Sequence, residues 1–495
     1  MKKFLIFTAL LAIATQSCTK LSETVYDKYD AQSFYAASTG PNIALAAVYA
    51  QMTQYAGADN GWYDQNSMSA DDQVIPHRNT GDWQLDFAQF YMRENLPSLG
   101  ITNNVWNFLY KSIYLSNQAI AQLTAANASP ALISEAKVMR AWFYYLLIDD
   151  YGDVPFYTDN NTTTAQLKVQ PRATTYAWIV SELKANIDNL STTRGGAYYG
   201  RFNKWAGYTI LAKLYLNAGV YTGTPDWADA LAACNVVASG GFTLHPATAS
   251  SSALLGNTYY DLFGDVCPND ETILAIYEKR LTVGNNIYAL RSLTTKTGQN
   301  LFGYAGWNGT IIPADFYTRY SSNTGDVRLK QFLVGPQPSG ENFTLNISSL
   351  ENPGAGVTEG VRDVKFFAVT PNDGSGESND FPVYRYADIL LMMAECNVQL
   401  GNPGAAKPFI DQVRVRAGLP ALTANPTLTD IYNERGIELI EEAHRRQDMI
   451  RFGTFTQSHG AAPVIVPAVG SFRTIFPIPT NALNANPNLK QNPGY

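Results

Sequence analysis

This 495-residue chain has few cysteines and histidines, and its basic residues do not outnumber its acidic ones. None of the four cysteines forms a C-x-x-C pair, so the sequence indicates neither a disulfide framework nor a zinc site. The four histidines include no H-E-x-x-H arrangement, which gives a catalytic metal no support. The formal net charge of −7 disfavours a nucleic-acid-binding protein, which would present a basic face.

Three motifs of common enzyme classes are also missing. The sequence contains no G-x-S-x-G, no G-x-x-x-x-G-K-[ST] and no G-x-G-x-x-G. These patterns mark the serine nucleophile of hydrolases, the phosphate-binding loop and the dinucleotide-binding turn. We therefore expect no cofactor, and the sequence gives no positive indication of an enzyme.

The N-terminus has the layout of an exported protein. Lys2 and Lys3 precede an apolar run over residues 4–14, which is too short to anchor the chain across a bilayer. Cys18 follows at the expected cleavage point and resembles the cysteine of a bacterial lipobox, although Thr15 stands where leucine is usual. We expect residues 1–17 to be a signal peptide and Cys18 to be lipidated. The alternative is ordinary signal cleavage beside an incidental cysteine.

Helical periodicity dominates the rest of the chain. Apolar residues recur at i, i+3 or i+4, and i+7 in segments that end at glycine or proline. The expected helices lie at 41–54, 102–124, 130–149, 174–190, 203–219, 226–239, 387–398 and 403–417. Pairs of this length joined by tight turns predict a mainly α fold of about eight helices, arranged as tetratricopeptide-like hairpins in an α–α superhelix. Cys234 and Cys396 occupy apolar helical positions, which predicts small buried side chains.

Long insertions interrupt the helical pattern. We divide the mature chain into an N-terminal helical region (18–241), a loop-rich insertion (242–383) and a C-terminal helical region (384–495), packed as one globular unit. A second, shorter insertion runs from about 56 to 100 and is rich in Asp, Asn, Gln and aromatic residues. Insertions of this length inside a compact protein usually carry function, so we expect the binding residues to lie in these two segments.

Three groups of residues form a further pattern. They are Glu135–Tyr144 with Tyr151–Pro155; Tyr384–Glu395 with Ile410–Pro420; and Glu434–Arg451 with Phe476–Pro479 and Gln491–Tyr495. Together they resemble the SusD/RagB family of bacterial outer-membrane proteins. Their order and spacing make the combination much more specific than any one fragment. The chain departs from the family pattern at Ala443, where glycine is usual, and at Arg446-Gln447, where two aromatics are usual.

The resemblance implies a fold, a location and a partner. Proteins of this family consist of tetratricopeptide-like helix pairs with loop-rich insertions. They are lipid-anchored at the cell surface in the outer membrane and cover a SusC-like TonB-dependent transporter. They bind an oligosaccharide or, in some members, a peptide, pass it to the transporter, and are not enzymes.

An acidic and basic segment near the C-terminus invites a hydrolase interpretation. Glu438 and Glu442 are one helical turn apart, with side chains roughly 5–6 Å from each other, but neighbours on one helix face point the same way and cannot flank a scissile bond. Neighbouring arginines would also keep these carboxylates ionised, which does not suit a general acid. We expect structural ion pairs, specifically Glu441–Arg445 and Glu442–Arg446, at i, i+4 spacing.

Two loop segments have the composition of a sugar-binding site. Such a site needs exposed aromatic faces for stacking, ringed by polar groups that bind hydroxyls. The candidate ligand-binding residues are Asp72, Arg78, Asp82 and Trp83 in the first insertion, and Tyr304, Trp307 and Asn308 in the second. No apolar periodicity surrounds either tryptophan, so a core role has little support from the pattern, although a loop tryptophan often only plugs its own loop.

Several functions remain open from the sequence. The leading hypothesis is a glycan-binding lipoprotein that delivers its ligand to a SusC-like transporter. The alternatives are a surface glycoside hydrolase or esterase, a structural transporter lid with little affinity of its own, and a peptide-binding member of the family. Turnover of an oligosaccharide by the purified protein would favour the hydrolase or esterase. Absence of any glycan affinity would favour the structural lid.

Overall fold

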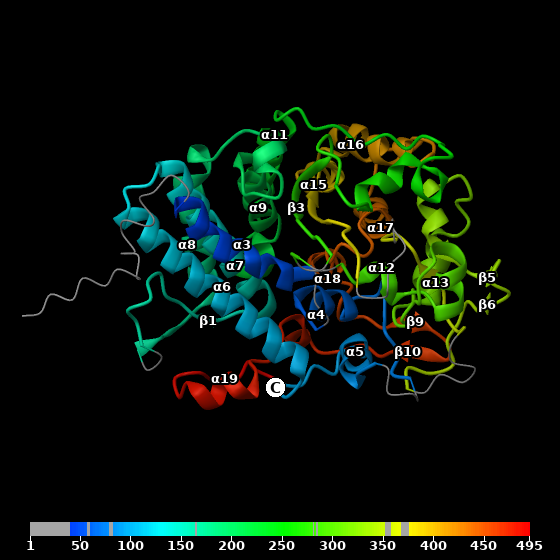
Figure 1. The fold of residues 1–495 in the computed structure, drawn as a ribbon, viewed down its shortest axis with the longest axis horizontal. Helices are drawn as coiled ribbons and strands as arrows, with labels where there is room; N and C mark the ends of the chain where they lie inside the picture. The colour runs from blue at the N-terminus through cyan, green and yellow to red at the C-terminus, as the bar shows by residue number, and fades with distance from the viewer. Residues whose placement is uncertain are drawn as a thin grey trace, which may run out of the picture.

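The computed structural model describes residues 40–56, 60–78, 83–163, 166–280, 282–283, 286–351, 358–367 and 376–495. The expected signal peptide, Cys18 and Asp82 lie outside these residues. Within the described ranges, most of the secondary structure is helical, and the helices run across the whole width of the molecule (Figure 1). No helix in this part of the chain is both long enough and apolar enough to cross a membrane.

The first long hairpin is formed by α6 (Gly100–Ala125) and α7 (Pro130–Tyr151). Ser129 caps α7 through its hydroxyl, which accepts a hydrogen bond from the amide of Leu132, and Pro130 occupies the first helical position. Gly152 ends the helix with φ of 74°, a conformation that glycine adopts without strain. The α7 helix is central, because nearly all of its second half is buried.

Further helix pairs extend this arrangement. The long helices are α3 (Gly40–Ala56), α8 (Arg172–Asn186), α9 (Lys204–Leu216), α11 (Trp227–Ala238), α15 (Tyr386–Gln399) and α16 (Pro403–Arg416). α9 packs on α11, α11 on α15 and α15 on α16, so consecutive pairs stack side by side along the top of Figure 1. The expected tetratricopeptide-like helical fold is confirmed. Cys234 on α11 and Cys396 on α15 are fully buried, as predicted from their apolar positions.

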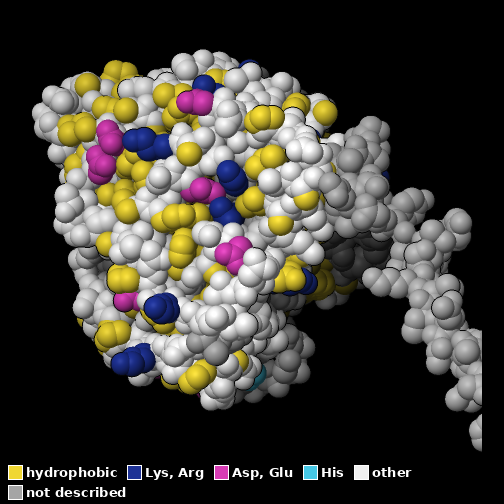
Figure 2. Space-filling model, turned by 90° about the vertical axis from the view of Figure 1, so that its left-hand side faces the viewer, with side chains coloured by type: hydrophobic (Ala, Val, Ile, Leu, Met, Phe, Trp, Pro, Cys, Tyr) yellow, Lys and Arg dark blue, Asp and Glu magenta, His cyan; other side chains and the backbone are white. Residues whose placement is uncertain are grey.

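The surface at one end of the molecule is sparsely charged. Figure 2 views the side that lies at the left of Figure 1, and shows Lys, Arg, Asp and Glu side chains as scattered groups among apolar and neutral polar atoms. Charged residues make up 16% of the whole sequence, against about a quarter in an average globular protein.

The insertions contain more regular structure than the sequence pattern indicated. The first insertion forms α4 (Trp62–Met68) and α5 (Leu85–Tyr91), and the second forms α12 (Tyr288–Arg291), α13 (Thr295–Phe302) and α14 (Ala314–Tyr320). These insertions, in which the sequence pattern indicated no helix, therefore contain short helices. Helices of four to eight residues span too few turns for their apolar period to stand out.

Short antiparallel strand pairs join distant parts of the chain. The pairs are β1 (Val154–Pro155) with β2 (Val169–Gln170), β3 (Thr272–Ile276) with β8 (Phe381–Arg385), β4 (Phe332–Leu333) with β7 (Arg362–Asp363), β5 (Gly335–Pro336) with β6 (Asn342–Phe343), and β9 (His459–Ala461) with β10 (Val464–Val466). In the fully buried pair of β3 and β8, Thr272 lies opposite Arg385. Because β8 runs directly into α15, this pair ties the second insertion to the C-terminal helices.

The C-terminal region begins with α17 (Leu428–Glu438), which stops where the sequence suggested a continuous helix. Glu441 and Ala443 both have left-handed backbone, with φ of 58° and 59°, before α18 (Arg445–Arg451) starts. This break explains why glycine is the usual residue at position 443 in the family pattern. It also removes the i, i+4 geometry on which the predicted Glu441–Arg445 and Glu442–Arg446 pairs depended.

The last residues fold back against α6 and α7. α19 (Thr480–Ala485) packs on α6 and lies at the bottom of Figure 1. The side-chain amide of Asn492 donates hydrogen bonds to the carbonyl oxygens of Tyr151 (2.9 Å) and Phe476 (2.8 Å). The terminal Asn-Pro-Gly-Tyr segment is thus fixed to the end of α7.

Candidate ligand-binding site

A buried network of ion pairs surrounds the end of α17. Glu442 accepts hydrogen bonds from Arg385 Nε and from Lys365 Nζ, each at 2.7 Å. Glu438 accepts from Arg385 and Arg328, each at 3.0 Å, and also from Arg416. The prediction of structural ion pairs is confirmed here, but the predicted partners were wrong, because the arginines come from β8, α16 and the second insertion and not from α18.

Electrostatics in this network do not suit acid–base catalysis. Burial alone would raise the pKa of Glu438 and Glu442, but the surrounding cations outweigh it and hold both pKa values below their usual range. Glu441 behaves in the opposite way: burial, and then the nearby carboxylate of Asp363, raise its pKa well above the ordinary value. The expectation that arginines keep the whole cluster ionised is therefore wrong for Glu441. All three glutamates are buried, which leaves no access for a substrate.

The structure brings together the two loop segments that the sequence indicated. Val74 and Ile311 exchange backbone hydrogen bonds of 3.0 and 2.9 Å, which places the segments beside each other. The guanidinium of Arg78 then donates to the carbonyl oxygens of Asn308 (2.7 Å) and Gly309 (3.2 Å). Four of the seven candidate residues therefore form one cluster, although more than 220 positions separate its two halves in the chain: Arg78, Trp83, Trp307 and Asn308.

The two tryptophans of this cluster have different exposure. Trp83 is only 7% exposed, and its indole Nε1 donates a 3.2 Å hydrogen bond to the carbonyl oxygen of Trp307. The two indole rings lie 6.4 Å apart between centroids at an angle of 45°. A Cβ atom at Gly309 would lie 2.4 Å from the Trp83 ring, so glycine allows this close packing. Trp307 is half-buried, so Trp83 supports it from beneath while part of its ring remains accessible.

Three other candidate residues in the described part of the chain are buried, and Tyr304 and Arg78 bind other groups of the protein. Tyr304 is buried and donates its hydroxyl hydrogen bond to the carbonyl of Ala289. Arg78 is buried and binds the loop backbone, and Asp72 is 1% exposed. These three side chains and Trp83 are buried and differ from the exposed groups predicted. For Arg78 and Trp83, the contacts that hold them come from the second insertion. Asp82 lies outside the described residues.

Asn308 has the most distinctive backbone of the candidate residues. Its φ of 54° is in the left-handed region, and its side-chain oxygen accepts a 2.8 Å hydrogen bond from Arg362. The backbone N–H of Asn308 donates a hydrogen bond to the carbonyl oxygen of Leu293 at 2.8 Å. Asn308 is half-buried, so Trp307 and Asn308 together form the accessible part of the cluster.

Adjacent carboxyl groups at Asp71 and Asp72 have opposite pKa shifts. Burial would raise the pKa of Asp71, but Arg445, whose Nε lies 2.6 Å from Asp71, outweighs it and lowers the pKa well below its usual range. Burial, followed by the negative charge of Asp71, raises the pKa of Asp72 to about 8. Such pairs occur in acid–base catalysts. Here both side chains are buried, which favours a structural role.

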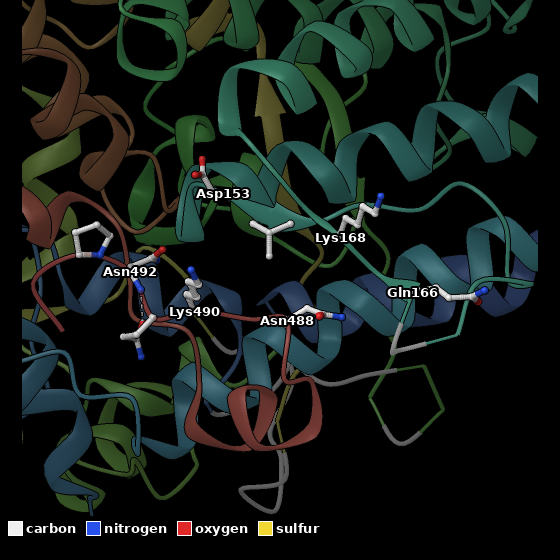
Figure 3. A pocket seen from close by; sticks show the side chains of 9 residues that line it. Asp153, Gln166, Lys168, Asn488, Lys490 and Asn492 are labelled. Carbon is white, nitrogen blue, oxygen red and sulfur yellow. Dashed lines mark hydrogen bonds between the residues drawn. The ribbon is translucent and has the colours of Figure 1, made fainter.

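Two cavities lie near the C-terminal tail, away from the residues that the sequence indicated. The larger, about 630 Å³, lies between the segment that carries Asp153 and Lys168 and the tail that carries Asn488 and Lys490 (Figure 3). A second cavity, of about 320 Å³, lies between α6 and α19 and is lined in part by Trp106. The sequence pattern pointed to neither, because it assigns α6 to the helical scaffold and marks only the insertions as candidate binding segments.

Comparison with known proteins decides the family. A family model described as the SusD family matches residues 317–495, and a second, described as starch-binding associating with outer membrane, matches residues 28–216. The chain belongs to the SusD/RagB family. This membership confirms the resemblance drawn from the sequence motifs, and it places the chain among binding proteins, not enzymes.

Individual members of the family match most of the chain. The starch-binding protein SusD of Bacteroides thetaiotaomicron is 26% identical over 419 residues, which cover 73% of this chain and 72% of that protein. SusD-like protein P25 of Formosa agariphila is 24% identical and covers 85% of this chain and 84% of its own length. The second family model also associates its members with the outer membrane.

Solved structures of SusD-like proteins share the fold. A laminarin-binding SusD-like protein has a TM-score of 0.72 at 22% identity and covers 92% of this chain and 99% of its own. Surface glycan-binding protein A from Bacteroides thetaiotaomicron, in complex with laminarihexaose, has a TM-score of 0.73 at 21% identity, with 92% and 99% coverage. At these identities the likeness supports the fold alone.

Proposed function

We propose that this chain is a cell-surface lipoprotein that binds an oligosaccharide and delivers it to a SusC-like TonB-dependent transporter in the outer membrane. The observation that carries the proposal is its similarity, over nearly three quarters of its length, to a protein described as starch-binding. Cys18, placed directly after the apolar N-terminal run, would carry the lipid anchor. Family membership is what supports the SusC-like partner.

Within this proposal, the cluster around Trp307 forms the ligand site. A sugar ring presents apolar C–H groups that stack on an aromatic face, and hydroxyl groups that bind amides at its rim. The half-buried indole of Trp307 and the neighbouring side chain of Asn308 supply these two elements. Trp83 and Arg78 hold the loop from behind, through Trp83 Nε1 and the two carbonyl contacts of Arg78.

A binding experiment on two tryptophan variants tests this assignment. Affinity electrophoresis and calorimetry with starch, laminarin and other neutral glycans would first identify a ligand of the protein. Trp307→Ala should then weaken binding by about 30- to 1,000-fold, the loss of about 2–4 kcal/mol expected for a stacking residue, with little change in melting temperature. Trp83→Ala should lower the melting temperature, because it removes a buried indole.

The outcomes separate the site from the family role. Unchanged affinity in Trp307→Ala would contradict the site while leaving a glycan-binding function intact. Failure of every glycan to bind the wild-type protein, together with co-purification of a large membrane barrel, would instead favour a structural lid. Binding of peptides, but of no glycan, would identify a peptide-binding member.

A further inference from the structure

The exposed face of α6 has an unusual composition. Its solvent-facing positions include Asn104, Asn107, Tyr114 and Gln118. The 26-residue helix contains no Asp or Glu, and Lys111 is its one basic residue. Exposed helix positions are usually occupied by charged residues, which are strong helix formers and keep the surface soluble.

Helix stability does not account for the two asparagines. Asparagine is among the weaker helix formers, and alanine, glutamate or lysine would stabilise an exposed turn better. Neither Asn104 nor Asn107 has a side-chain hydrogen bond to any other residue in the described part of the chain. Their amide groups are therefore available to bind a ligand at a cost in helix propensity.

Asn107 lies at the edge of the 320 Å³ cavity between α6 and α19. Trp106 and Tyr110 contribute aromatic rings from α6, with centroids 4.8 Å apart, and Tyr157 adds a ring whose plane lies within 9° of that of Tyr110. On the opposite wall, Asn481 of α19 donates a 3.2 Å hydrogen bond to the side-chain oxygen of Asn103. Aromatic rings and amides thus meet around one hollow.

The lining of this cavity carries no charged side chain among the described residues. Trp106, Pro155 and Leu489 are buried and form its apolar base, whereas Asn107 is exposed at its rim. A hollow of this size, with apolar surface and a few polar groups, is within the range of small-ligand sites. The absence of charge favours an uncharged ligand, because an ionic group would lose hydration here without gaining a counter-ion.

From this arrangement we infer that the cavity between α6 and α19 is a second saccharide-binding site, separate from Trp307, that takes a neutral oligosaccharide. Tyr110 and Tyr157 would contact the C–H face of a sugar ring, and Asn107 would bind its hydroxyl groups. The inference rests on the proposed function for the class of ligand. Two sites on one molecule would hold a long glycan more tightly than either site alone.

Calorimetry on the full mature protein tests this site, with maltohexaose and laminarihexaose as the neutral probes. The key variant is Asn107→Lys, which fills the rim with a charged side chain while keeping a good helix former. Gln118→Lys is its matched control, since it makes the same charge change on the same exposed face, about three turns further along α6. Both are combined with Trp307→Ala to isolate the second site.

The Trp307→Ala protein should still bind at least one of the two hexasaccharides. Adding Asn107→Lys should weaken that remaining binding by at least about tenfold, as expected for losing an amide contact and blocking the rim. Adding Gln118→Lys should leave it unchanged. Melting curves of all variants should agree within a few degrees, because both positions are exposed.

Three results would overturn the inference. If Trp307→Ala alone abolishes binding of both probes, there is no second site, although the proposed function stands. If residual binding persists unchanged in Asn107→Lys, it lies elsewhere. If Asn107→Lys keeps saccharide binding but loses co-purification with an outer-membrane transporter, the α6 face is a protein interface. If the single variant Asn107→Lys loses saccharide binding while the single variant Trp307→Ala keeps full affinity, the result would support the second site and contradict the first.

Discussion

Single residues in this protein are controlled by distant partners more than by their neighbours in sequence. Glu442 illustrates this, since the cations that bind it are Arg385 at the end of β8 and Lys365 in the second insertion. Arg446, four positions along the chain, donates instead to the carbonyl oxygen of Thr474 at 2.8 Å. The left-handed backbone that precedes α18 turns the chain so that successive side chains reach different partners.

This geometry makes Glu442 important for folding and not for binding. In Glu442→Gln the shape is kept but the negative charge is lost, which leaves Arg385 and Lys365 under-compensated in a fully buried site. We expect a destabilisation of about 3–5 kcal/mol, the cost of breaking a buried ion pair, measured by denaturant unfolding. Glycan affinity of the folded protein should be unchanged.

Asp188 provides a matched control for this prediction. It pairs with Lys204 at 2.9 Å, but its side chain is largely exposed. Asp188→Asn should therefore cost less than about 1 kcal/mol. Equal effects of the two substitutions, or a Glu442→Gln protein that is stable but has lost its ligand, would contradict the structural role of Glu442.

At the level of elements, the long helices could be predicted from sequence and the strand pairs could not. The boundaries expected for 130–149 differ from those of α7 by two residues at the end, because apolar spacing, a serine cap and a glycine stop are all local signals. The pairing of β3 with β8 joins residues more than 100 positions apart, and no local pattern specifies such a contact.

The candidate site was predicted in part for the same reason. Loop composition correctly selected two segments that meet, since aromatic and hydrogen-bonding residues in long insertions often have a functional or structural role. Composition could not predict which of these side chains are exposed and which are buried. Trp83 has the sequence context of an exposed loop residue, yet Trp307 and Gly309 bury it. The cavity beside α6 could not be predicted from the apolar stripe of that helix, because its amides lie outside the stripe.

At the level of the whole molecule, the proposed lipid anchor determines where the protein works. Cys18→Ala should move the protein from the membrane to the soluble fraction, since acyl chains contribute about 0.8 kcal/mol per buried methylene. Cell fractionation should be carried out in a strain that lacks the transporter, so that docking cannot retain the protein. A variant that still fractionates with membranes there would contradict anchoring at Cys18.

Stability of the whole molecule should also depend on pH in a way set by its buried acids. Burial raises the pKa of Asp72, Asp150 and Glu278 to about 8 in each case. Their ordinary values are near 4, so between about pH 4 and pH 8 the folded state binds more protons than the unfolded chain. Stability contributed by these groups is therefore present at low pH and is lost as pH rises towards 8.

Asp72→Asn isolates this effect at one position. Asparagine resembles the protonated carboxyl group, so the variant and the wild type should have similar melting temperatures near pH 5. At pH 8.5 the wild type must ionise a buried carboxyl group and the variant need not, so the variant should be the more stable. The difference should grow by at most about 1.4 kcal/mol per pH unit inside the window.

Asp71→Asn is the adjacent control, with the opposite expectation. Asp71 stays ionised in the folded protein and binds Arg445 through two oxygens at 2.6 and 2.9 Å. Losing its charge should destabilise the protein at both pH 5 and pH 8.5, because Arg445 would remain buried without its counter-ion. Thermal unfolding of the two variants between pH 5 and pH 8.5 measures whether their stabilities change with pH in these two different ways. If Asp72→Asn is destabilised at pH 8.5 as strongly as Asp71→Asn, then Asp72 is ionised in the folded state, and the raised pKa assigned to it is wrong.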